Sequence, residues 1–154
     1  MRMSLAAILA VAVLGAAPGA VAASPAAATR VQRMESVVRA WSARLNANDN
    51  AGIARLFNVP ALIVQGPDAY RLPTRALVAK WFSLLPCSGR ILSIGVSGRY
   101  ATATFRLGNR GSSPCDAPGV LAAARFEIVN GKITSWEQVP VATQKPPAQT
   151  GPLA

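Results

Sequence analysis

Apolar residues in the first half of the chain recur at helical spacing. Over residues 31–46 they fall every three or four positions, which predicts an amphipathic helix. The polar segment 46–50 ends this helix and caps a short second one, which must close before Pro60. Thr74 can cap a third helix that runs to about Leu85. Three helices are therefore expected before the pattern changes.

The second half of the chain alternates apolar and polar positions, as a strand with one buried face does. A short strand is expected over residues 61–64, before the third helix. In the segment 90–97, Leu92, Ile94 and Val96 share one face. Three more strands with the same alternation are expected over residues 101–107, 120–128 and 132–139. This order is typical of an α+β fold in which a curved antiparallel sheet wraps around three N-terminal helices.

The N-terminus has the pattern of a secretory signal peptide. Arg2 is followed by an apolar run and then by the small residues Ala20-Val21-Ala22, which are typical of a cleavage site. The run is too short to cross ~30 Å of hydrocarbon comfortably, and we expect no transmembrane segment elsewhere. An uncleaved anchor is the alternative. We expect cleavage near Ala22 and a protein that is secreted or extracytoplasmic, in the cell envelope or periplasm.

These patterns divide the chain into four regions. A signal peptide covers residues 1–22, and a disordered spacer rich in Ala, Ser and Pro covers 23–30. One folded domain covers 31–140, a length that supports a single core but not two domains. A disordered tail rich in Pro, Gly, Gln and Thr covers 141–154.

The two cysteines are expected to form a disulfide. An oxidising exterior favours a bridge between Cys87 and Cys115, and the hairpin predicted between them returns the chain to its starting end. Two thiolates alone cannot complete a zinc site, and the chain has no histidine to supply further ligands. We therefore expect no metal and no cofactor.

Charge narrows the classes of function. The chain carries 16 Lys and Arg residues against 6 acids and has a net charge of +10. The cations are spread evenly, without the clustered stripe that nucleic-acid binding needs, so no nucleic-acid partner is expected. Attraction to an anionic envelope surface is a physically reasonable alternative function. The absence of histidine excludes every mechanism that needs an imidazole.

Two segments carry a resemblance to a known superfamily. Residues 37–57 are similar to the first two helices of the nuclear transport factor 2-like superfamily, also called ketosteroid isomerase-like or SnoaL-like, and residues 126–136 are similar to its last hairpin. The resemblance covers about 31–139 and implies a cone-shaped fold that encloses a deep apolar pocket. It also implies a homodimer that pairs sheet to sheet. The superfamily includes enzymes and non-catalytic binding domains, so it does not fix a function.

The isomerase branch of this superfamily needs a carboxylate base and two proton donors around the pocket. The resemblance places these three positions on Trp41, Gly66 and Ala124, none of which is an acid or a phenol. We therefore expect no catalytic residue of this type, and we lean towards a non-catalytic protein.

Five residues are candidates for the lining of the pocket: Trp41, Asp68, Tyr70, Trp81 and Ala124. Three are aromatic, one is an acid close to Tyr70 in the sequence, and the resemblance adds Ala124. The leading hypothesis is an exported domain that binds a small apolar ligand or a partner protein. An enzyme of isomerase, hydrolase or dehydratase type, with an unrecognised arrangement around Asp68 and Tyr70, is the alternative. For Asp68, the competing interpretation is that of a turn former.

Overall fold

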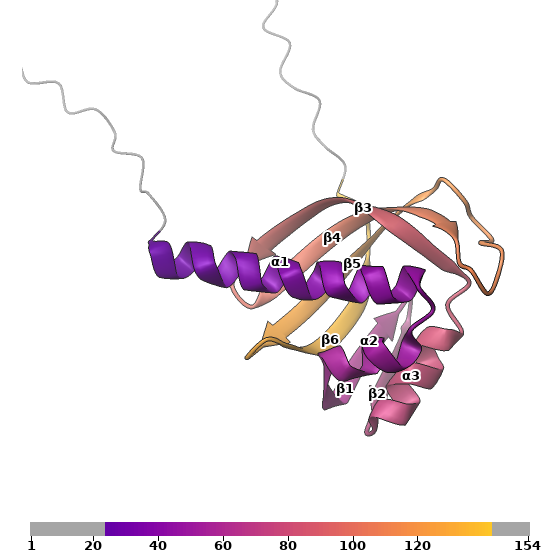
Figure 1. Cartoon of the computed structure of the whole chain (residues 1–154), viewed down its shortest axis with the longest axis horizontal. Coiled ribbons are helices and arrows are strands. Elements are labelled where there is room, and N and C mark those ends of the chain that lie inside the picture. Colours follow the sequence, from indigo (N-terminus) through magenta and orange to yellow (C-terminus); the bar gives the residue numbers. More distant parts are fainter. Residues whose placement is uncertain (1–23, 143–154) are drawn as a thin grey trace, which may run out of the picture.

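The computed structural model describes residues 24–142, which form three helices and six strands (Figure 1). The expected signal peptide and all but the first two residues of the expected tail lie outside the described residues. The elements in chain order are α1 (Pro25–Asn46), α2 (Asn50–Leu56), β1 (Phe57–Gln65), β2 (Asp68–Leu72), α3 (Arg75–Ser83), β3 (Cys87–Ser97), β4 (Tyr100–Asn109), β5 (Leu121–Val129) and β6 (Lys132–Val139). No helix among the described residues has both the length and the apolar character needed to cross a membrane.

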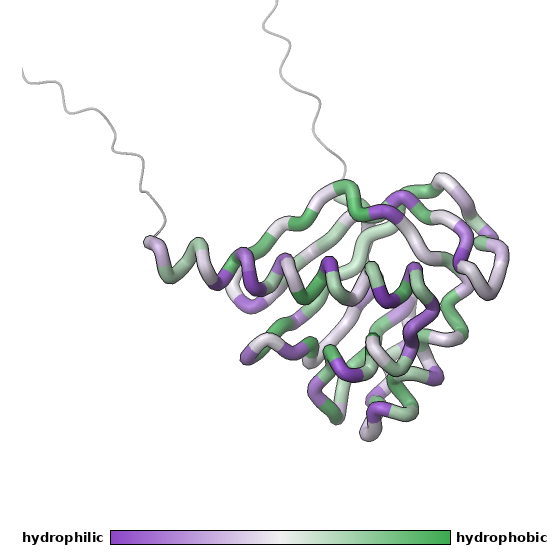
Figure 2. Tube along the Cα trace, viewed as in Figure 1, coloured by the Kyte–Doolittle hydropathy of each residue, from purple (hydrophilic) through white to green (hydrophobic). Residues whose placement is uncertain are grey.

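All six strands belong to one curved sheet, in the order β2-β1-β6-β5-β4-β3. Only the β1–β6 pairing is parallel, and the other four are antiparallel. Helix α1 lies across one face of the sheet, and α2 and α3 lie side by side near β1 (Figure 1). Figure 2 shows hydrophilic and hydrophobic positions alternating along α1, as an amphipathic helix requires. The predicted α+β class, with a curved sheet around three helices, is confirmed.

Helix α1 begins earlier than its apolar stripe indicates. Ser24 is the N-cap, its side chain accepts a hydrogen bond from the backbone N–H of Ala27 at 3.3 Å, and Pro25 occupies the first helical position. These two residues and the alanines after them favour helix, so residues 25–30 are helical where a disordered spacer was expected. Periodicity did not reveal this segment because it is exposed and has no apolar face to bury.

The structure corrects the region around the first strand. Phe57, expected in the second helix, is the first residue of β1, and the strand continues to Gln65. A tight turn at Gly66, where φ is +59°, leads into β2, a strand that the sequence did not predict. Almost every side chain of β2 is exposed, so its sequence has no buried alternate face to signal a strand.

The first long strand contains an irregularity that alternation cannot reveal. The pairing of β3 with β4 shifts register between Ile91 and Ser93, so Leu92 falls in a bulge and is 42% exposed. Ile91, Ile94 and Val96 pack against the core instead. The expectation that Leu92 shares a buried face with Ile94 is therefore wrong, because one extra residue reverses the faces on one side of the bulge.

An aromatic cluster forms the centre of the core, between α1, α3 and the sheet. Trp41 is 3% exposed, and its ring centroid lies 5.0 Å from that of Phe126 and 5.8 Å from that of Phe105. The ring centroid of Trp136 lies 6.3 Å from that of Trp41. Contacts of this kind add to the apolar area that each ring buries. The cluster fixes where α1 crosses the sheet.

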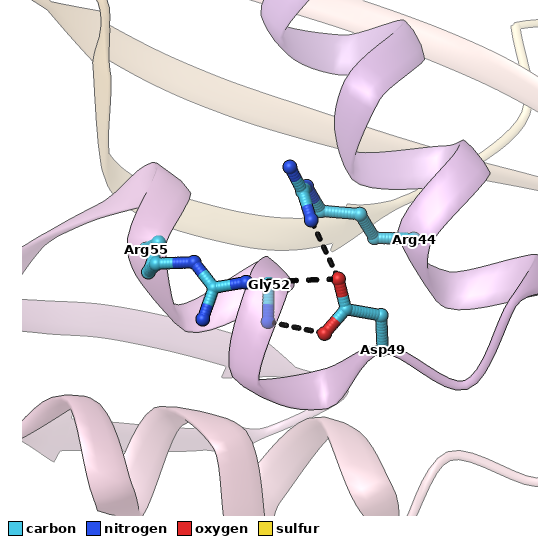
Figure 3. A network of polar contacts seen from close by, with 4 residues as sticks. All are labelled: Arg44, Asp49, Gly52 and Arg55. Atoms are coloured by element: carbon cyan, nitrogen blue, oxygen red, sulfur yellow. Dashed lines mark hydrogen bonds and ion pairs between the residues drawn. The ribbon is translucent and has the colours of Figure 1, made fainter.

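The corner between α1 and α2 is organised by Asp49 (Figure 3). One carboxylate oxygen of Asp49 accepts a hydrogen bond from the backbone N–H of Gly52 at 2.7 Å, and the other pairs with Arg44 at 2.5 Å. Arg55 approaches the same oxygen at 3.9 Å. We call these four residues the Asp49 corner. The hydrogen bond from Gly52 lowers the pKa of Asp49, and the two arginines lower it further.

Candidate functional site

A pocket of about 550 Å³ opens between the second half of α1 and one end of the sheet. Trp41 and Leu45 of α1 form one wall, and Phe105 and Ala124 of the sheet form the opposite one. The lining also includes the start of β3, the end of β6 and the loop 110–120 that precedes β5. The volume lies within the range of pockets that bind small molecules.

Small residues in the sheet create this space. Residues 122–124 are three consecutive alanines at the start of β5, and all three line the pocket. Ala124 pairs with Ala103 on one side and with Gln138 on the other, so no large apolar side chain fills the inner face there. The core is close-packed around Trp41 and becomes hollow towards the alanines. The pocket is therefore a consequence of residue size along one strand.

The interior of the pocket offers no free hydrogen-bonding group among its aromatic residues. The indole Nε1 atoms of Trp41 and Trp136 are buried and have no hydrogen-bond partner in the described part of the chain. Because neither atom is accessible to solvent, neither is available to a ligand in the open pocket. Besides the buried serines Ser42 and Ser88, the polar side chains of the lining are the exposed residues Gln65, Gln138 and Asp116 at the rim.

The rim has an uneven charge. None of the described residues that line the pocket is Lys or Arg, and Asp116 is the single acid among them. Asp116 is exposed to solvent and lies in the loop 110–120. One of its carboxylate oxygens is 3.1 Å from Cys87 Sγ, which places the acid beside the disulfide.

The predicted disulfide between Cys87 and Cys115 is confirmed. It joins the start of β3 to the loop 110–120, with the two Cα atoms 4.5 Å apart. Cys87, Cys115 and Asp116 bring three metal-ligand atoms within 4.8 Å of one another. Both sulfur atoms are used in the S–S bond, however, so this group has only one carboxylate to offer a metal ion.

A buried arginine fixes the other end of the same loop. Arg110 is 4% exposed, and its guanidinium donates to the backbone oxygens of Phe82 at 2.6 Å and Leu85 at 3.0 Å. It also donates to the side-chain oxygens of Asn48 and Asn50, each at 2.9 Å. We call these five residues the Arg110 anchor. Burial lowers the pKa of Arg110. All four of these acceptors are neutral oxygens, whereas a buried arginine is usually paired with a carboxylate.

The structure separates the pocket candidates into two groups. Trp41 and Ala124 line the pocket. Asp68 and Tyr70 lie on the edge strand β2, where Tyr70 is 42% exposed, and neither belongs to the lining. Trp81 is also outside the lining, and its ring centroid lies 5.3 Å from that of Trp136. The expectation that all five residues surround one pocket is corrected to these two.

Sequence reasoning overlooked Asp116 and Arg110. Both lie in a loop rich in Gly, Ser and Pro, which has no periodicity to predict where its side chains point. The one available signal was position, since Asp116 directly follows a cysteine that was expected to be bridged. Gly66, which the resemblance aligned with the base of the isomerase branch, lies in the turn between β1 and β2 and not in the lining.

Solved structures share this architecture. The chain is similar to a candidate polyketide cyclase from Sinorhizobium meliloti, with 18% identity and a TM-score of 0.56, over 70% of this chain and 99% of that one. It is similar to a nuclear transport factor 2-like protein of unknown function from Cytophaga hutchinsonii, with 10% identity and a TM-score of 0.57, over 68% and 87% of the two chains.

A third similar structure, from Catenulispora acidiphila, is a protein with a ketosteroid isomerase-like fold in complex with trimethylamine. Its identity is 18% and its TM-score 0.53, over 68% of this chain and 84% of that one. No protein-family model and no curated protein matches the sequence. The chain therefore has the nuclear transport factor 2-like fold, and these similarities extend to the fold alone.

Proposed function

We propose that this protein is an exported, non-catalytic binding protein that holds a small apolar molecule in its pocket. The observation that carries the proposal is a cavity of about 550 Å³ whose inner walls are aromatic and aliphatic. The N-terminal pattern of a signal peptide and the Cys87–Cys115 disulfide support export. The similar protein from Catenulispora acidiphila was solved with trimethylamine, which supports the view that this fold accommodates small molecules.

The composition of the pocket argues for binding over catalysis. The resemblance aligns Ala124 with a proton donor of the isomerase branch, and Asp116 is the single ionisable side chain among the described residues of the lining. Acid–base catalysis on a bound substrate normally needs a base and an electrophilic partner placed together. The alternative of an enzyme built around Asp68 and Tyr70 loses support, because both residues lie on β2 outside the lining.

Native mass spectrometry of the mature protein, recovered from its own culture medium without reductant, tests the proposal directly. The expected spectrum contains a species heavier than the bridged protein by the mass of one small molecule. A protein that is recovered empty, and that also binds no apolar probe, would overturn the proposal. In that case the partner-protein and envelope-surface alternatives gain weight, and salt-reversible retention on isolated envelopes would separate those two.

A pair of variants ties any retained molecule to the pocket. Ala122 lines the pocket, so Ala122→Trp should fill it and abolish retention. Ala69 is exposed on β2 and outside the lining, so Ala69→Trp adds the same side chain elsewhere and should leave retention unchanged. Equal retention by both variants would show that the molecule binds at another place.

A further inference from the structure

The lining of the pocket is opposite in charge to the whole chain, and nearby arginines belong to an adjoining groove that contains Arg39, Arg90 and Arg106. The sequence has 16 Lys and Arg residues and 6 acids. If the charged residues were distributed at random over the protein, the lining of a pocket would be expected to contain more cations than acids. Among the described residues of the lining, however, there is one acid, Asp116, and no Lys or Arg.

Asp116 also differs from most other acids of the chain because no cation pairs with it within the described part of the chain. Four of the six acids form ion pairs with arginines in the described residues, namely Glu35, Asp49, Glu127 and Glu137. Within residues 24–142, Asp116 has no cationic group within the 4.0 Å of an ion pair, although 15 cations lie outside the expected signal peptide.

The backbone beside Asp116 is fixed, which confines its carboxylate to the rim of the pocket. Cys115 is bridged to Cys87 at the start of β3, and the Cys115 backbone N–H donates to the side chain of Asn109 at 3.0 Å. A charged group that is held in place before a ligand arrives loses little conformational entropy on binding.

These observations discriminate between three kinds of ligand with the same apolar body. An anion would bring its charge to a lining that, among the described residues, has an acid and no cation. A neutral molecule would bury its body but leave Asp116 without a partner. A protonated amine can bury its body against Trp41 and Phe105 and pair with Asp116 at the rim.

We infer that the pocket takes an amphipathic amine, with its apolar body between α1 and the sheet and its protonated nitrogen beside Asp116. This inference rests on the proposed function, since it names the chemical class of the molecule that the pocket binds.

Three probes of one shape test the inference: 1-adamantanemethylamine, 1-adamantanemethanol and 1-adamantanecarboxylic acid. Isothermal titration calorimetry on the disulfide-bonded protein gives each Kd, and tryptophan fluorescence reports on the pocket itself through Trp41 and Trp136. The amine should bind about fivefold more tightly than the alcohol, as an exposed ion pair allows, and the acid should bind most weakly. The preference should shrink in 1 M salt.

The chain offers a matched control for the acid. Asp116→Asn should remove the preference for the amine and leave binding of the alcohol unchanged. Asp68→Asn removes the same charge from β2, outside the lining, and should keep the preference. The control matters because the net charge of +10 alone would favour the acid over the amine.

The outcomes separate this inference from the proposed function. If the alcohol and the amine bind equally, or if the acid binds best, the amine inference is overturned and the proposed function stands. If Asp116→Asn and Asp68→Asn lower the preference equally, the inference is also overturned, because a general field then explains it. If no probe binds and no molecule is retained from the culture medium, both are overturned.

Discussion

Three consecutive residues, Asn48 to Asn50, lie where the turn after α1 leads into α2, and they belong to two networks with opposite electrostatic environments. Asp49 lies at the surface, where its charge meets Arg44 and Arg55. Asn48 and Asn50 turn the other way and accept hydrogen bonds from Arg110, a charge taken out of water with no acid beside it. The Asp49 corner has opposite charges in a medium that screens them, whereas the Arg110 anchor has one charge and only neutral oxygens.

The comparison indicates that burial, and not the number of charges, determines how much a network contributes to the free energy of unfolding. Exposed ion pairs contribute little because water and salt screen them. A buried guanidinium must be fully hydrogen-bonded, and each of its partners then depends on it as well. We therefore expect the Arg110 anchor to contribute more to stability than the Asp49 corner.

The largest effect should come from Arg110→Met, which keeps the length of the side chain but removes every donor. Two asparagine side chains and two backbone oxygens then each lose a hydrogen bond in a buried or partly buried site. We expect a loss of about 4 kcal/mol in the free energy of unfolding, measured by urea denaturation. Arg110→Lys should restore only a small part, because one ammonium cannot reach four separated oxygens. A loss below about 1 kcal/mol would contradict the comparison.

The second largest effect should come from opening the disulfide with the double variant Cys87→Ala, Cys115→Ala. The bridge spans 28 residues, for which the loop-entropy relation gives about 3.5 kcal/mol as an upper value. Because the bridge also holds Asp116 at the pocket, the variant should lose the amine preference while the Arg110 anchor keeps the other end of the loop in place. Unchanged stability and unchanged probe affinities would show that the anchor alone fixes the loop.

Much of the fold could be predicted from the sequence, because its core faces are periodic. The apolar stripe that includes Trp41 placed α1, and the alternation that includes Ala124 and Phe126 placed β5. The pairing of Cys87 with Cys115 followed from compartment and hairpin geometry. In each case the signal is local, since neighbours a few positions apart share one buried face.

The site was harder to predict because it depends on residues far apart in the chain. Arg110 is buried among residues that are distant in the chain, including Asn48, which lies 62 positions earlier. Asp116 reaches the pocket because the disulfide draws its loop to β3. The bulge at Leu92 also depends on how β3 pairs with β4, so the alternation of apolar and polar residues could not predict it.

A smaller effect should come from Gly52→Ala in the Asp49 corner. A Cβ at this position would collide with the Asp49 carboxylate and with the guanidinium of Arg44. The side chains must move apart, so the hydrogen bond from the Gly52 backbone to Asp49 should weaken. The higher helix propensity of alanine offsets part of the loss. We expect a net destabilisation well below that of Arg110→Met, and a gain in urea midpoint would show that the corner rearranges freely.

The smallest effect should come from Asp49→Asn, which keeps an N-cap side chain but removes its charge. The Gly52 N–H and the two arginines hold the pKa of Asp49 below its ordinary value of 3.8, so the folded state favours the ionised carboxylate. Its contribution is therefore present above the unfolded pKa and is lost as the pH falls through the lower, folded pKa. Wild type should exceed the variant in urea midpoint at pH 7, and the two should converge as the pH falls below about 4. An Arg110→Met curve run in parallel should show no such convergence, because its loss does not depend on a carboxylate. If the Asp49→Asn difference persists unchanged at pH 2, hydrogen-bond geometry and not charge stabilises the corner, and the two networks then differ only in burial.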